Sequence, residues 1–86
     1  MTAIELERIF VGNDVPTQYY SFDGMGGGDN YVLENANGTW RTFYSERGSA
    51  DDIRTYADED EACRGMFALV ARMMRSSQHR DIALDA

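Results

Sequence analysis

Hydrophobic and polar positions along the chain predict a short helix near the N-terminus. Leu6 and Phe10 fall on one helical face, because they are four residues apart. Thr2 and Glu5 have the spacing of a capping box, in which each side chain accepts a hydrogen bond from the other residue's backbone. Gly12 is a typical stop signal. We therefore expect one amphipathic helix that ends near this glycine and is stable only when docked on another element.

Four segments rich in aromatic and β-branched residues follow, and they predict strands at 18–22, 30–36, 39–46 and 53–57. Asn37-Gly38 joins the second and third segments and is typical of a two-residue type I′ hairpin turn. A two-residue turn fixes the register, so each residue has one predicted cross-strand partner. The predicted pairs include Tyr31 with Tyr44, Val32 with Phe43 and Glu34 with Arg41. Residues 47–51 predict a turn before the last strand.

A second and longer helix is predicted from Asp58, which has the chemistry of an N-cap and is followed by three acidic residues that suit a helix start. Its apolar positions follow a 3.6-residue period: Ala62, Cys63, Met66, Phe67, Val70, Met73 and Met74. We expect residues 76–86 to form a frayed tail, since they show no such period. The predicted fold is one α+β domain over 1–75: a small antiparallel four-stranded sheet with both helices, in the order α-β-β-β-β-α.

The charge balance limits the partners. The chain has 86 residues, eight basic against fifteen acidic, a net charge of −7 and a sequence pI near 4.4. Nucleic acids and anionic membranes require basic surfaces, so neither is an expected partner. A basic protein would be attracted and would associate faster. The chain lacks a predicted secretory leader or membrane span and has one cysteine, so we expect a cytoplasmic protein.

Few residues suggest chemistry. The glycine-rich segment 24–28 is not followed by the Lys-Ser/Thr pair of a phosphate loop, and Asp23 and Asp29 flank it with negative charge. Cys63 falls on the apolar helix face and His79 in the tail, which does not favour a nucleophile–base pair. The carboxylates at 58–61 are typical of helix capping rather than metal binding. We therefore expect a protein with no catalytic residue, no metal and no cofactor.

The remaining candidate is a binding surface on the sheet. Tyr, Trp and Arg are enriched at the energetic centres of protein interfaces, and carboxylates around them would meet a basic partner. Both faces of the predicted sheet carry aromatic residues, so each face is a candidate binding surface. The candidate partner-binding residues are Trp40, Tyr44, Glu46, Arg47, Asp23, Asp29, Glu34, Asp51 and Asp52.

The segment from Trp40 to Gly48, which ends in Tyr-Ser-Glu-Arg-Gly, and the later Glu-Ala-Cys at 61–63 resemble small bacterial immunity-type proteins of polymorphic toxin systems. The order of the N-terminal helix, the proline, the Tyr-Ser strand and the glycine-rich loop agrees, so the resemblance spans residues 4–74. The absence of Lys and the tail from Ser76 depart from that pattern. It implies a non-enzymatic protein that binds a cognate toxin and occludes a basic active-site cleft. Two alternatives are a small structural or regulatory subunit, homodimeric through an open sheet face, and a ligand binder with the glycine loop as a lid.

Overall fold

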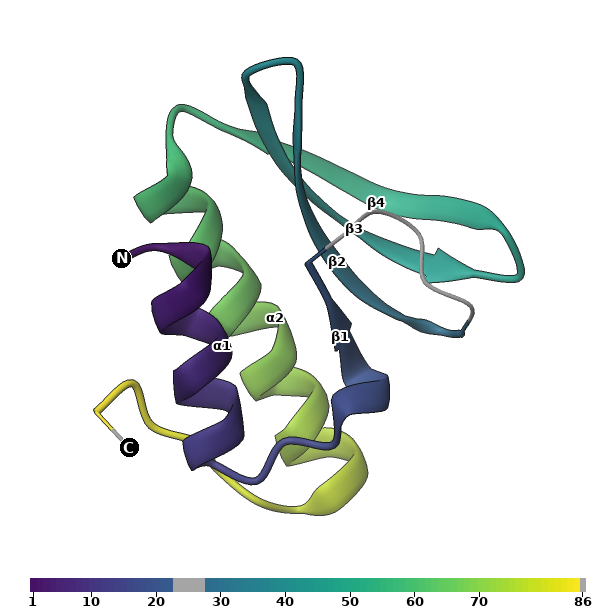
Figure 1. The fold of residues 1–86 in the computed structure, drawn as a ribbon. Helices are drawn as coiled ribbons and strands as arrows, with labels where there is room; N and C mark the ends of the chain where they lie inside the picture. The colour runs from purple at the N-terminus through teal and green to yellow at the C-terminus, as the bar shows by residue number, and fades with distance from the viewer. Residues whose placement is uncertain (23–27, 86) are drawn as a thin grey trace.

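A computed structural model describes residues 1–22 and 28–85 of the chain. Two helices lie on one side of a four-stranded sheet (Figure 1), which confirms the predicted α+β class and element order. The elements are α1 (Ala3–Gly12), the 3-10 turn η1 (Thr17–Tyr19), β1 (Tyr20–Ser21), β2 (Asn30–Ala36), β3 (Thr39–Glu46), β4 (Ser49–Tyr56) and α2 (Glu59–Gln78).

The sheet has the order β1-β2-β3-β4, and the first pairing differs from the prediction. β1 is only two residues long and runs parallel to β2, whereas the other two pairings are antiparallel. The first two residues of the predicted strand at 18–22 lie instead in the turn η1, which is closed by a hydrogen bond from the Tyr19 amide to the Pro16 carbonyl. Tyr20 of β1 faces the helices, where the centre of its ring lies 4.8 Å from that of Phe10.

Both hairpin turns are two residues long and have positive φ at both positions. Asn37 and Gly38 have φ of 54° and 87°, and the predicted β2–β3 register is confirmed residue by residue. Arg47 and Gly48 have φ of 50° and 83°. The turn predicted over 47–51 is therefore too long, and β4 begins at Ser49 rather than at residue 53. A β-bulge beside Phe43 places Asp52 at φ 54°, which accommodates the extra residue in β4.

The two helix starts are tied together by carboxylates. The predicted capping box is present, with the Glu5 amide 3.2 Å from the Thr2 hydroxyl and the Thr2 amide 3.0 Å from the Glu5 carboxylate. Asp58 caps α2 by accepting from the Glu61 amide at 2.9 Å, as predicted. Glu59 also accepts from the amide of Ala3 in the first turn of α1. This contact satisfies one of the unpaired amides that every helix start presents.

The main core lies between the helices and the sheet. Leu6 and Phe10 of α1 pack with the buried face of α2 and with Leu33 of β2. Phe67, predicted near the centre of this face, is half-buried at its margin and stacks on Phe10 at 6.4 Å. The predicted stripe omitted Leu69, which the structure buries.

Two apolar residues are also buried on the opposite face of the sheet. Val32 and Phe43 are paired across β2 and β3 and are 0% and 1% exposed, although they point away from the helices. The Arg41 guanidinium lies 5.3 Å from the centre of the Phe43 ring and forms an ion pair with Glu34. These two apolar side chains are therefore buried within a single chain.

The C-terminal segment is more ordered than predicted. α2 continues to Gln78, and His79 ends it in the left-handed region at φ 54°. Beyond it, the Asn13 side chain exchanges two hydrogen bonds with the Ala83 backbone, at 2.8 and 3.0 Å. Arg80 donates to the carbonyls of Asn13 and Asp14, and Ile82 packs against the core. Residues 76–78 therefore continue α2, and residues 80–83 contact the end of α1, where the sequence pattern predicted a frayed tail.

Candidate functional site

A row of tyrosines crosses the sheet on the side that faces the helices. Tyr20, Tyr31 and Tyr44 are successive cross-strand partners on β1, β2 and β3, and Asp51 on β4 continues the row. Cross-strand partners project to the same face of a sheet. Tyr20 is buried under the helices, whereas Tyr31 and Tyr44 are half-buried. The row therefore runs from the core to a partly open end.

At this end, a hollow of about 330 Å³ lies between the sheet and the last turns of α2. The rings of Tyr31 and Tyr44 form its sheet wall and meet edge to face, with centroids 5.0 Å apart and planes at 68°. The helical wall consists of Arg72, Met73, Ser76 and Ser77. Two aromatic rings with polar groups at the rim make a surface suited to binding, since aromatic side chains supply much of the contact energy at interfaces.

The surroundings of Tyr44 are acidic. Partial burial raises the pKa of its hydroxyl, and the negative charges of Asp29 and Glu46 raise it further. Asp51 lies opposite Tyr44 on the neighbouring strand. Within residues 1–22 and 28–85, these three carboxylates form no ion pair and no side-chain hydrogen bond. Their charge is therefore available to a partner.

The other dense group of carboxylates, at the start of α2, is used within the chain. Asp58 and Glu59 accept backbone hydrogen bonds, and Glu61 accepts one from the Ala57 amide at 3.1 Å. Asp60 binds the N-terminal ammonium of Met1 at 2.7 Å, which lowers the Asp60 pKa, and also pairs with Arg64. This agrees with the predicted capping role for residues 58–61. The two acidic regions thus differ in whether their charges already have partners.

The predicted partner-binding residues divide between the two ends of the β2–β3 hairpin. Tyr44 lines the hollow, and Asp29, Glu46 and Asp51 lie near Tyr44 without lining the hollow themselves. Exposed Arg47 lies in the adjoining turn, and Asp52 lies at the bulge, where it pairs with Arg54 at 3.2 Å. Trp40 lies on the helix-facing side but four residues from Tyr44, about 13 Å along an extended strand, where it packs against the core.

Glu34 lies near Trp40 and is already paired with Arg41. Asp23 lies outside the described residues, as do most of the glycines that the ligand-lid alternative requires. The helical wall of the hollow was missed because residues from Ser76 onward were predicted to fray. No glycine or proline occurs between Gly65 and Gln78, and this was the available signal that α2 continues.

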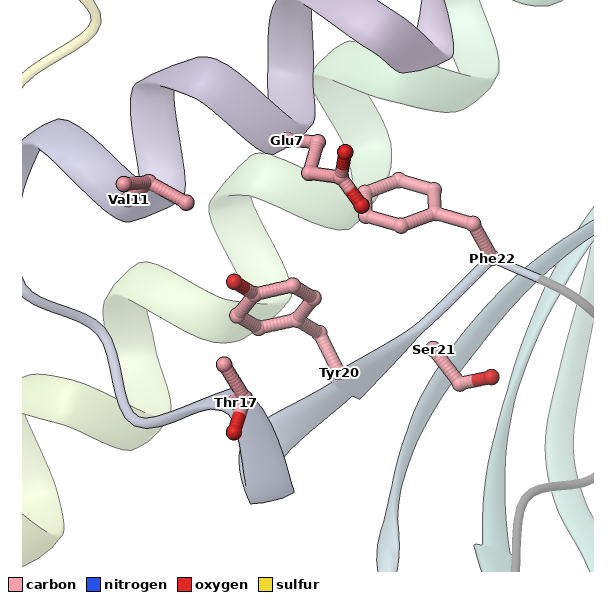
Figure 2. A pocket seen from close by; sticks show the side chains of 6 residues that line it. All are labelled: Glu7, Val11, Thr17, Tyr20, Ser21 and Phe22. Carbon is pink, nitrogen blue, oxygen red and sulfur yellow. The ribbon is translucent and has the colours of Figure 1, made fainter.

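A second hollow of about 350 Å³ lies between α1 and β1 (Figure 2). Val11, Tyr20 and Phe22 give it apolar walls, and the Glu7 side chain extends from α1 toward the Phe22 ring. Val11 is 60% exposed. Among the described residues, Glu7 is the one charged residue that lines this hollow, as Arg72 is in the Tyr31–Tyr44 hollow.

Cys63 and His79 are not placed for joint chemistry. Cys63 is fully buried and belongs to the core, as predicted, whereas His79 is exposed at the end of the same helix. Sixteen residues of helix separate their Cα atoms by roughly 24 Å. Among the described residues, no group of three or more His, Cys, Asp or Glu side chains is arranged to hold a metal ion.

We expect the buried thiol to make stability fall at alkaline pH. Burial raises the pKa of Cys63 from 9.0 to about 11, so the folded thiol keeps its proton after the unfolded thiol has lost it. The resulting stabilisation is complete below pH 9 and is lost as the pH rises toward 11. Urea unfolding at about pH 8 and about pH 10 measures this loss, which Cys63→Ala should reduce. An equal loss of stability in the parent protein and in Cys63→Ala would contradict the assignment of this pH dependence to Cys63.

No family model, curated protein or solved structure matches this chain. In the part of the chain that the structure describes, no helix combines the length and apolar character needed to cross a membrane. The candidate site therefore depends on its geometry and charge: an aromatic hollow at one end of the sheet, with three carboxylates near Tyr44 that have no partner among the described residues.

Proposed function

We propose that this protein is a non-enzymatic immunity protein, which binds a basic bacterial toxin domain and blocks its active-site cleft. The observation that carries the proposal is the contrast between the two acidic regions. Carboxylates 58–61 are engaged within the chain, whereas Asp29, Glu46 and Asp51 are unpaired among the described residues around the Tyr31–Tyr44 hollow. An acidic surface with an aromatic centre suits a basic cleft and accelerates encounter with it.

The resemblance to immunity-type proteins supports the same partner class, because it covers the strand that carries Tyr44 and Glu46. Burial of Val32 and Phe43 in one chain does not favour the alternative of a homodimer formed through an open sheet face. In the proposed complex, the aromatic hollow lies at the centre of the interface. The three carboxylates form the charged rim, which mainly sets the association rate.

The test is co-expression with the product of the neighbouring gene, followed by co-purification and binding kinetics. We expect rescue of growth and a tight complex whose association slows from about 50 to 500 mM salt. The triple variant Asp29→Asn/Glu46→Gln/Asp51→Asn should associate about tenfold more slowly at low salt, because it removes the steering charges.

The matched control is Glu7→Gln/Asp14→Asn/Asp85→Asn. It changes the net charge by the same amount at exposed carboxylates on α1, its C-terminal turn and the tail. We expect its association rate to fall much less. Failure to rescue and to co-purify would overturn the toxin proposal. An equal effect of both triple variants would show that net charge acts without a defined surface.

A further inference from the structure

We propose that the Tyr31–Tyr44 hollow accepts one cationic side chain, an arginine or lysine of the partner, between its aromatic wall and the carboxylates that lie near Tyr44. The inference rests on the proposed function in one respect: the toxin supplies the cation. The two rings, with centroids 5.0 Å apart, and the acidic residues at the end of the sheet are observed in the chain itself.

The size of the hollow suits a single side chain. Its volume of about 330 Å³ is near the lower end of ligand sites in proteins, which span about 300–1,000 Å³. Met73 contributes a flexible apolar contact on the helical wall, against which the aliphatic stem of an arginine or lysine can pack.

The aromatic wall and the rim favour positive charge over negative charge. Ring faces of tyrosine attract guanidinium and ammonium groups, and guanidinium also stacks on them. Asp29 and Glu46 lie close enough to affect the Tyr44 hydroxyl electrostatically, and they can pair with a cation held against its ring. An anion at the same place would meet these two negative charges.

Arg72 on the helical wall has the opposite charge to the carboxylates near Tyr44. It lines the hollow from α2 and has no ion pair among the described residues. Its positive charge opposes an incoming cation, whereas Glu46 favours one. Substitutions on the two walls should therefore change cation binding in opposite directions.

The experiment is an NMR titration of the isolated protein with N-acetyl-arginine amide, observing the ring signals of Tyr31 and Tyr44. The matched probe is N-acetyl-citrulline amide, which has nearly the same shape without the charge. We expect saturable shifts at millimolar concentrations of the arginine probe and at least fivefold weaker binding of citrulline. Glu46→Gln should weaken the arginine probe about threefold or more, Arg72→Gln should strengthen it, and Glu7→Gln on α1 should change it little.

Equal shifts with both probes would overturn the proposal, as would loss of binding in Arg72→Gln, which indicates an anion site. Because the titration contains no toxin, its failure is separate from failure of the proposed function. A toxin that binds and is neutralised, while the arginine probe leaves both tyrosines unaffected, would retain the function and reject this subsite.

Discussion

Phe43→Ala is expected to lower the free energy of unfolding by about 3–5 kcal/mol, the usual cost of truncating a buried phenylalanine. Phe43 is 1% exposed and pairs with the fully buried Val32 on the sheet face away from the helices. A domain of this length has a stability of about 4–13 kcal/mol at typical values per residue. The substitution should therefore remove a large share of the stability, as measured by urea or thermal unfolding followed by circular dichroism.

The matched control is Ile53→Ala on the neighbouring strand β4. Ile53 is 52% exposed, so its truncation should lower stability by less than about 1 kcal/mol. Similar small losses in both variants would mean that the sheet face around Phe43 is open in solution. That result would return this face to consideration as a binding surface and would favour the homodimer alternative.

Local patterns predicted most of the fold because the information lies within a few residues. Asn37-Gly38 favours positive φ at both positions, and this one turn sets the register that brings Tyr31 opposite Tyr44. The second turn was predicted too long because Arg47 is not a residue type typical of positive φ. The sequence pattern at that point favoured a loop, whereas the strand pairing imposed a tight hairpin.

Contacts between distant segments account for what the pattern could not predict. The parallel direction of β1 depends on packing of Tyr20 against Phe10, and the order of the tail depends on hydrogen bonds between Asn13 and Ala83. Neither contact produces a local periodicity. The hollow combines both cases, because its tyrosine wall follows from the predicted hairpin and its helical wall requires the extension of α2 beyond residue 75.

Gly65→Ala in α2 is a second stability test, because helix propensity predicts a more stable protein and side-chain packing predicts a less stable one. Alanine is about 1 kcal/mol more favourable than glycine inside a helix, so propensity alone predicts that Gly65→Ala stabilises the protein. A Cβ atom at this position, however, would lie 2.5 Å from the Tyr56 hydroxyl oxygen and 2.6 Å from the Cε1 atom of its ring. These distances are too short for non-bonded atoms, so the Tyr56 ring would have to move.

Movement of Tyr56 has consequences in the core. Its hydroxyl lies 3.0 Å from the hydroxyl of Thr42, which is fully buried on β3. Loss of this hydrogen bond leaves a buried polar group without its partner, and the displaced ring disturbs its packing against the core. We expect Gly65→Ala to lower the free energy of unfolding by about 2 kcal/mol in total, despite the gain in helix propensity.

The double-mutant cycle with Tyr56→Ala separates the two effects. Once the ring is removed, Gly65→Ala should stabilise the protein by up to about 1 kcal/mol, because only the propensity term remains. Ala68→Gly, at an exposed position of α2, measures the same difference in helix propensity in the reverse direction, as a loss of stability. If Gly65→Ala stabilises the protein with Tyr56 in place, the ring does not pack on the α2 backbone as described. A reversal of sign between the two backgrounds would establish that contact, which packs the end of β4 against α2.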